Sequence, residues 1–240
     1  VANFAATDIV LTFSKALYPS YSYVKDDPQM LKKYFLTTIF FMSVTVMPLM
    51  TLVGLYADSF VALFIGITWE EMVSPLKVLI IFGIVRSFAS ICGYVFWTLG
   101  RPNIQTMISL AQLLLIVLCI FPLISKFSIT GAAWAVTLPL IFTSFVSFFF
   151  TVKLLSINSD DCLTYFLSPS LALVTLVLAI SIIQTFFPNI PSIATFILNS
   201  IFLAIIYLVF LYIFDHFGSR KGRNLMTQLF EVIKNKGLSK

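Results

Sequence analysis

Arg86 is the residue whose place in the sequence most needs a chemical explanation. It lies near the middle of the apolar stretch 74–98, and an arginine at the centre of a membrane-spanning helix costs about 2.5–3.5 kcal/mol on insertion scales. Its side chain therefore has to face a water-filled cavity or a partner. The guanidinium group presents a planar fork of donors that suits the oxygens of a pyrophosphate. We interpret Arg86 as a candidate ligand contact; pairing with a helix dipole or with an acid on another helix is the structural alternative.

Small and polar residues share the expected helical face of Arg86. Ser90 and Gly93 follow it at spacings of four and seven residues, which places the three on one side of a helix. Asp8 and Lys15 are seven residues apart on an earlier apolar stretch and share a face in the same way. We expect both faces to line one cavity, with Lys15 as a second ligand contact or a local ion-pair partner. The alternative is that Lys15 extends its amine to the lipid headgroups.

A bend is expected around Pro48 and Gly54. The apolar run that contains them is too long for one membrane crossing and too short for two, so we expect 55–66 to be a bent continuation or an interfacial turn. Acids beside broken helices often hold the coupling ion of a transporter. Asp58 and Asp8 are therefore candidates for ion coupling, and an acid at the membrane interface is the alternative for Asp58. Pro48 and Gly54 are the predicted hinge.

Sequence patterns that support catalysis or cofactor binding are missing. There is no Walker-type glycine loop and no Ser/His/Asp combination. The single histidine, His216, offers little material for metal or acid–base chemistry. The three cysteines, Cys92, Cys119 and Cys162, lack the short spacing of a zinc site. We predict no catalytic residue, no metal and no cofactor, and hence a protein that is not an enzyme.

Long apolar segments must position these residues. Of the 240 residues, 60% are hydrophobic and only 10% are charged, against roughly 25% charged in an average soluble domain. A helix needs about 20 apolar residues to cross a hydrocarbon core, and blocks of that length recur here. We predict an all-α, polytopic membrane helix bundle with about seven transmembrane helices. The predicted spans are 1–20, 33–53, 74–98, 104–124, 130–152, 164–187 and 193–214.

Basic residues are distributed asymmetrically between the two sides of this arrangement. On one side, the loops and the tail hold Lys25, Lys32, Lys33, Arg101, Lys153, Arg220, Lys221, Arg223, Lys234, Lys236 and Lys240. The loops on the other side hold only Lys126. Because cytoplasmic loops are enriched in Lys and Arg, we predict a cytoplasmic C-terminus. The segment 216–240 is interpreted as a basic amphipathic helix on the anionic leaflet, or else as a partly disordered basic tail.

Several short motifs follow one another in a recognisable order along the first 155 residues. They are Tyr18-Pro19-Ser20 with Asp26-Asp27, Pro48, Gly54, Ala57-Asp58, the apolar stretch from Phe64 to Trp69, Pro75-Leu76, Leu99-Gly100-Arg101 and Gly131-Ala132-Ala133-Trp134. This order resembles the multidrug/oligosaccharidyl-lipid/polysaccharide exporter superfamily, and within it the flippases for polysaccharide or O-antigen units. The resemblance implies that the chain corresponds to helices eight to fourteen of a fourteen-helix transporter, whose N-terminal helices would be its missing partners.

The resemblance also implies a function. Members of the family enclose a cationic cavity for an undecaprenyl-diphosphate-linked oligosaccharide. The resemblance therefore implies that Arg86, Lys15 and Ser90 lie at the substrate, with Arg86 and Lys15 as contacts to its phosphates. We expect the protein to flip such a unit across the bacterial inner membrane by alternating access. Its expected partners are the lipid-linked oligosaccharide and membrane lipids, and no nucleic acid.

Three other functions are weighed against this one. A multidrug exporter of the same superfamily should carry acids in its cavity, because its substrates are usually cations. A membrane-embedded sugar polymerase or glycosyltransferase usually carries a large outer loop, and the outer loops expected here are short. A membrane scaffold without transport activity is the third.

Overall fold

The structure, a computed structural model, describes residues 21–157 together with Val174, Val177, Ile201 and Ile205. The chain divides into two compact units, Val1–Cys162 and Leu163–Lys240. All the helices described below belong to the first unit, and within its described part every regular element is helical.

Helix α2 (Pro28–Leu55) begins at a well-formed N-terminal cap. The Asp27 carboxylate accepts hydrogen bonds from the backbone N–H groups of Gln29 (3.0 Å) and Met30 (3.1 Å), and Pro28 occupies the first turn, where its missing N–H is no loss. The buried hydroxyl of Tyr21 donates to Thr38 Oγ1 at 2.9 Å. Burial raises the pKa of Tyr21, so this group remains a protonated donor that ties the preceding segment to α2.

The expected interruption at Pro48 and Gly54 is wrong, because α2 continues through both residues to Leu55. Pro48 is buried, and neighbouring helices allow membrane helices to tolerate the one backbone hydrogen bond that a proline removes. A Cβ at Gly54 would lie 3.6 Å from Ile80 Cδ1 of the next long helix, which is ordinary packing distance. Whether Pro48 and Gly54 act as a hinge during transport stays a prediction.

The chain reverses direction after α2, in a segment of three short helical turns. These are α3 (Ala57–Phe60), the π-helical η1 (Val61–Ile65) and the 3₁₀-helical η2 (Ile67–Met72). Between η1 and η2, Gly66 has φ 104° and ψ 153°, a conformation that is essentially restricted to glycine. This turn therefore depends on Gly66, twelve residues after the predicted hinge glycine.

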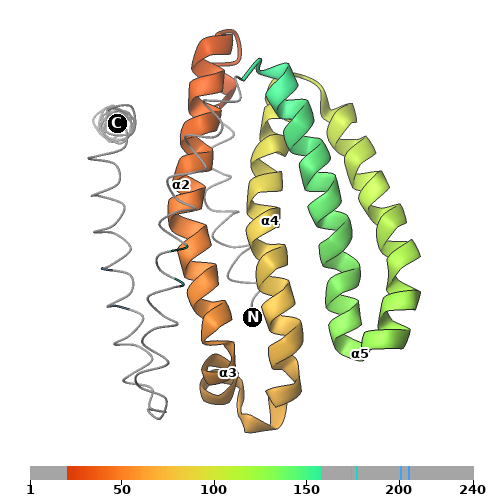
Figure 1. Cartoon of the computed structure of the whole chain (residues 1–240). Coiled ribbons are helices and arrows are strands. Elements are labelled where there is room, and N and C mark those ends of the chain that lie inside the picture. Colours follow the sequence, from red (N-terminus) through yellow and green to blue (C-terminus); the bar gives the residue numbers. More distant parts are fainter. Residues whose placement is uncertain (1–20, 158–173, 175–176, 178–200, 202–204, 206–240) are drawn as a thin grey trace. The chain divides into compact units, whose positions relative to one another are not determined.

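Helix α4 (Val73–Thr98) runs antiparallel to α2, and α5 (Pro102–Leu154) folds back on itself (Figure 1). The two halves of α5 meet at Ser128, whose φ of 50° and ψ of −129° are not helical. A Cβ at Gly131 would overlap the carbonyl oxygen of Leu123, so the close approach of the two halves requires a glycine there. The sequence placed this turn at Thr130-Gly131, and the structure places the backbone break two residues earlier.

The two halves of α5 differ in how they pack. In the second half, small and hydroxyl-bearing side chains are buried; they are Gly131, Ala133, Ala135, Thr137, Thr143, Ser147 and Thr151. Thr137 and Thr151 each donate to the carbonyl four residues earlier, at 2.7 and 2.9 Å, so their hydroxyls need no other partner. Small residues let membrane helices approach closely. In the first half most side chains are exposed, and Ile108 is the one classed as buried.

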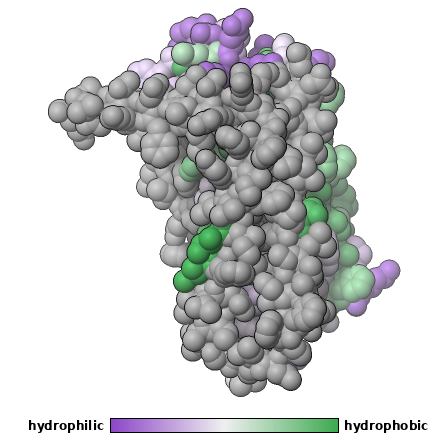
Figure 2. Space-filling view, turned by 60° about the vertical axis from the view of Figure 1, so that its left-hand side comes forward, coloured by the Kyte–Doolittle hydropathy of each residue, from purple (hydrophilic) through white to green (hydrophobic). Residues whose placement is uncertain are grey.

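Three helices of the described part, Pro28–Leu55, Thr68–Thr98 and Pro102–Leu154, are long and apolar enough to cross a membrane. The protein is thus an all-α membrane helix bundle. Hydrophilic residues gather at the upper end in Figure 2, where α2 begins and α4 ends. The basic residues placed at that end by these helices are Lys25, Lys32, Lys33, Arg101 and Lys153.

Candidate substrate-binding site on α4 and α5

Arg86 lies near the midpoint of α4 with an exposed side chain. Its guanidinium carbon is 5.6 Å from the centroid of the Phe82 ring, a cation–π contact that stabilises an exposed pair by about 0.5–1 kcal/mol. The contact holds the guanidinium group against its own helix, and within the described residues its N–H groups form no hydrogen bond or ion pair.

The acids of the described part all lie outside the middle of the helices. They are Asp26, Asp27, Asp58, Glu70 and Glu71. Within residues 21–157, therefore, the sequence-based alternative that Arg86 pairs with an acid on another helix has no acid at the right depth.

Ser90 lies one turn beyond Arg86 and is half-buried. Its hydroxyl donates to the carbonyl of Ser87 at 2.8 Å, and the buried Ser87 hydroxyl donates to the carbonyl of Gly83 at the same distance. Both protons are used within α4, so the oxygen of Ser90 is left as an acceptor. Ser90 can thus receive a hydrogen bond from a sugar hydroxyl but cannot donate one without rotating.

A contact between Gly93 and Gln105 fixes how α4 and α5 lie against each other. A Cβ at Gly93 would stand only 3.2 Å from Gln105 Oε1, so the amide of Gln105 rests directly on α4. Gln105 Oε1 is buried without a hydrogen-bond partner in the described part of the chain. Its Nε2 donates to Ser109 Oγ across a long 3.4 Å. Gln105 therefore brings an unused acceptor to the face that carries Arg86.

The register of the two antiparallel helices follows from this contact. Both rise about 1.5 Å per residue, so Arg86 lies near the depth of Gln112, and Ser90 lies near the depth of Ile108, one residue before Ser109. Gln105, Ser109 and Gln112 share one face of α5 because they are spaced by four and three residues. The set of these three residues with Arg86 and Ser90 is called the α4–α5 polar stripe below.

The first half of α5 diverges from α4 away from the turn that joins them (Figure 1). The polar stripe is consequently tightest at Gln105, next to the turn, and wider at Arg86. Sequence reasoning found Arg86 and Ser90 but missed the α5 side of the stripe. The signal that was available is the recurrence of Gln105, Ser109 and Gln112 at helical spacing inside an otherwise apolar stretch.

Asp58 is not brought to the polar stripe. Its carboxylate forms an ion pair with Lys77 Nζ at 2.9 Å, and the two side chains are 70% and 48% exposed. Lys77 precedes Arg86 by nine residues, or about 14 Å along α4. A role of Asp58 in ion coupling stays a prediction. Lys15 and Asp8 lie outside the described residues.

The chemistry of the polar stripe is that of binding. It offers a guanidinium fork, two carboxamides and two hydroxyls, which match phosphate oxygens and sugar hydroxyls as donors and acceptors. Within the described residues there is no group of three or more His, Cys, Asp or Glu side chains that could hold a metal ion.

Residues 1–74 match the family described as "Polysaccharide biosynthesis protein". No curated protein and no solved structure matches the chain. The match includes α2 and the turn after it, and it ends before Arg86. Over its first 74 residues this membrane protein is therefore similar to polysaccharide biosynthesis proteins.

Proposed function

We propose that this protein is a flippase of the multidrug/oligosaccharidyl-lipid/polysaccharide exporter superfamily, and a transporter, not an enzyme. Its substrate is an oligosaccharide repeat unit, such as an O-antigen unit, linked to undecaprenyl diphosphate. The observation that carries the proposal is the position of Arg86: a cation at the midpoint of an apolar helix, with an exposed side chain. The similarity of residues 1–74 to polysaccharide biosynthesis proteins supports the substrate class.

Arg86 lowers the cost of carrying a diphosphate through the membrane. A phosphate that leaves water loses its hydration, and charge-assisted hydrogen bonds from a fixed guanidinium replace part of what is lost. The carboxamides of Gln105 and Gln112 and the hydroxyls of Ser90 and Ser109 then meet the sugar hydroxyls. The isoprenoid chain stays in the bilayer while the head group crosses by alternating access. Lys15 is proposed as a further phosphate contact.

The basic end of the bundle supports an orientation. Lys25, Arg101 and Lys153 lie at the end where α2 begins and α5 both begins and ends, and cytoplasmic ends of membrane proteins are enriched in such residues. We place this end in the cytoplasm and the protein in the bacterial inner membrane, with a cytoplasmic C-terminus. An anionic head group would then meet a cationic surface on the side where lipid-linked sugars are assembled.

Complementation tests the proposal in a strain that lacks its own O-unit flippase, with the full-length gene expressed at matched membrane levels. We expect wild type to restore surface polysaccharide and Arg86→Gln to lower it about tenfold or more, since a hydrogen bond to a charged group is worth about 1.5–3 kcal/mol. Arg86→Lys should fall between the two, because it keeps the charge and loses the fork.

Lys126→Gln is the matched control, since it removes a cation from the turn of α5 and should leave transport unchanged. If Arg86→Gln restored polysaccharide as well as wild type did, the diphosphate assignment would be wrong. If wild type itself failed in hosts with several different sugar units, the flippase proposal would be wrong as a whole.

A further inference from the structure

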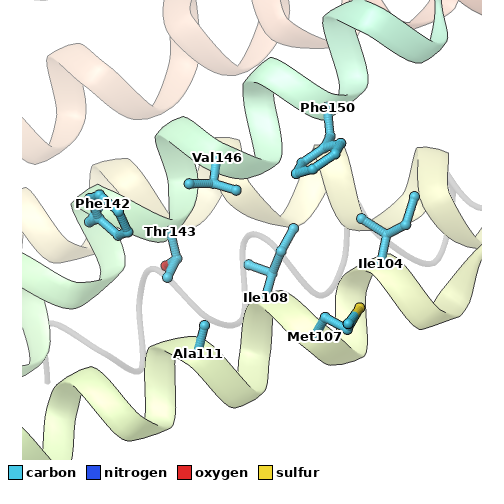
Figure 3. A pocket seen from close by; sticks show the side chains of 8 residues that line it. All are labelled: Ile104, Met107, Ile108, Ala111, Phe142, Thr143, Val146 and Phe150. Atoms are coloured by element: carbon cyan, nitrogen blue, oxygen red, sulfur yellow. The ribbon is translucent and has the colours of Figure 1, made fainter.

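The two halves of α5 enclose an apolar groove of about 380 Å³ (Figure 3). Its walls are formed mainly by Ile104, Met107 and Ile108 from the first half and Phe142, Val146 and Phe150 from the second. Thr143 contributes the one hydroxyl, which is already bonded to the carbonyls of Pro139 (2.9 Å) and Leu140 (3.2 Å) of its own helix. The lining of the groove therefore has no polar side-chain group that lacks a hydrogen bond and would need a polar ligand.

The rim of the groove is formed by exposed side chains of α5. Met107 is 73% exposed and Phe142 is 61% exposed, in a helix that is apolar and long enough to cross a membrane. An apolar space of this kind does not hold water well, and a surface helix that is apolar on its exposed side belongs in lipid. A hydrocarbon chain is the natural occupant.

Cations stand at one end of this groove. Arg101 precedes Ile104 by three residues and Lys153 follows Phe150 by three, so each lies about 4.5 Å beyond the lining residues along its helix. Both side chains are exposed, and α5 begins and ends at the same end of the bundle (Figure 1). The ion pair recorded among the described residues joins Asp58 and Lys77 instead, so Arg101 and Lys153 keep their charge for a ligand.

We propose that the hairpin of α5 binds an anionic membrane phospholipid, with one acyl chain in the groove and the phosphate head between Arg101 and Lys153. Basic sites between membrane helices on the cytoplasmic side recognise anionic head groups in this way. The charge at one end and the apolar lining along the rest select a lipid over a soluble phosphate. The site shares no residue with the α4–α5 polar stripe, and only the cytoplasmic placement of Arg101 and Lys153 rests on the proposed function.

Native mass spectrometry of the detergent-purified full-length protein tests the proposal. Phosphatidylglycerol and phosphatidylcholine with identical acyl chains are added separately, and the apparent affinity for each is read from the bound fraction. We expect phosphatidylglycerol to bind about tenfold more tightly, and the double variant Arg101→Gln/Lys153→Gln to bind both lipids equally. The control Lys126→Gln, at the other end of the hairpin, should keep the preference.

A second variant tests the groove itself. Ala111 also lines it, and Ala111→Phe should fill the space and weaken both lipids alike while thermal unfolding stays cooperative. Equal binding of the two lipids by wild type, or a preference that survives the double variant, would overturn the proposal. So would a protein that binds neither lipid and runs as a dimer. Displacement of phosphatidylglycerol by undecaprenyl phosphate at equimolar concentration would also overturn it, because the groove would then belong to the transported lipid.

Discussion

The ion pair of Asp58 and Lys77 is exposed to solvent, and this exposure limits how much it can stabilise the fold. Its two side chains are more than 45% exposed at a 2.9 Å separation, and exposed pairs contribute about 0–1 kcal/mol to stability. Lys77 already neutralises the Asp58 carboxylate, which the sequence offers as a candidate for binding a coupling ion. A coupling ion would have to displace the amine.

Asp58→Asn and the exchanged pair Asp58→Lys/Lys77→Asp separate these two roles. If the pair is only a contact between α3 and α4, Asp58→Asn should change the free energy of unfolding by no more than about 1 kcal/mol and leave transport intact, and the exchanged pair should behave like wild type. Complementation and chemical unfolding in detergent measure both quantities. Loss of transport in Asp58→Asn that the exchange does not restore would instead establish ion coupling.

For single residues, the sequence identifies a side chain such as Arg86 that is costly to insert into any membrane helix. It does not identify a side chain whose role depends on a neighbour in the fold. Arg86 could be singled out because a mid-span arginine is expensive in any membrane helix. Gln105 looks like an ordinary polar residue until its contact with Gly93 shows that its oxygen is buried and unused. The ion pair of Asp58 with Lys77 likewise joins residues nineteen positions apart, and no local sequence pattern predicts it.

The turn between α2 and α4 depends on backbone geometry more than on side-chain packing. Gly66 adopts φ 104° and ψ 153° between two short non-α turns, whereas Gly54 is helical. The sequence predicts a bent continuation or an interfacial turn at 55–66, and the short turns α3, η1 and η2 lie over 57–72. The expected interruption of the helix at Pro48 and Gly54 is absent because a proline in a membrane helix need not end it, and the positive φ at Gly66 is a property that only the fold shows.

Gly66→Ala and Gly54→Ala make a matched pair. We expect Gly66→Ala to lower the free energy of unfolding by about 1–3 kcal/mol, because alanine is strained at that φ and ψ. Gly54→Ala should be neutral or slightly stabilising, since a helical glycine costs about 1 kcal/mol relative to alanine and its Cβ has ordinary room beside Ile80. Denaturation followed by circular dichroism distinguishes them, and equal destabilisation would contradict this account of the turn.

For the whole molecule, the fold class could be predicted because hydropathy is summed over long segments and single exceptions do not change it. The described part contains three helices able to cross a membrane, and the α5 hairpin shows why spans can be located better than their boundaries. Its 53 residues are helical apart from the break at Ser128. Across this turn Gly131 lies close to the carbonyl group of Leu123, an approach that depends on how the two halves fold back and not on a local sequence pattern.

The proposed orientation predicts which ends of the bundle a reagent reaches from outside. In a variant whose native cysteines are replaced by alanine, Lys126→Cys should react with a membrane-impermeant maleimide in intact cells, and Arg101→Cys should react only after the cells are opened. The reason is the excess of basic residues at the end that carries Arg101. The reverse pattern of labelling would place that end outside the cytoplasm.

Transport in a purified system tests the central claim most directly. The full-length protein is reconstituted into liposomes that contain a fluorescent saccharide linked to a polyprenyl diphosphate, and the fraction of saccharide accessible to an external quencher is followed in time. We predict that wild type moves the head group across the bilayer, that Arg86→Gln slows this movement about tenfold or more, and that Lys126→Gln does not. Movement at the wild-type rate in Arg86→Gln, or no movement above protein-free liposomes, would contradict the account.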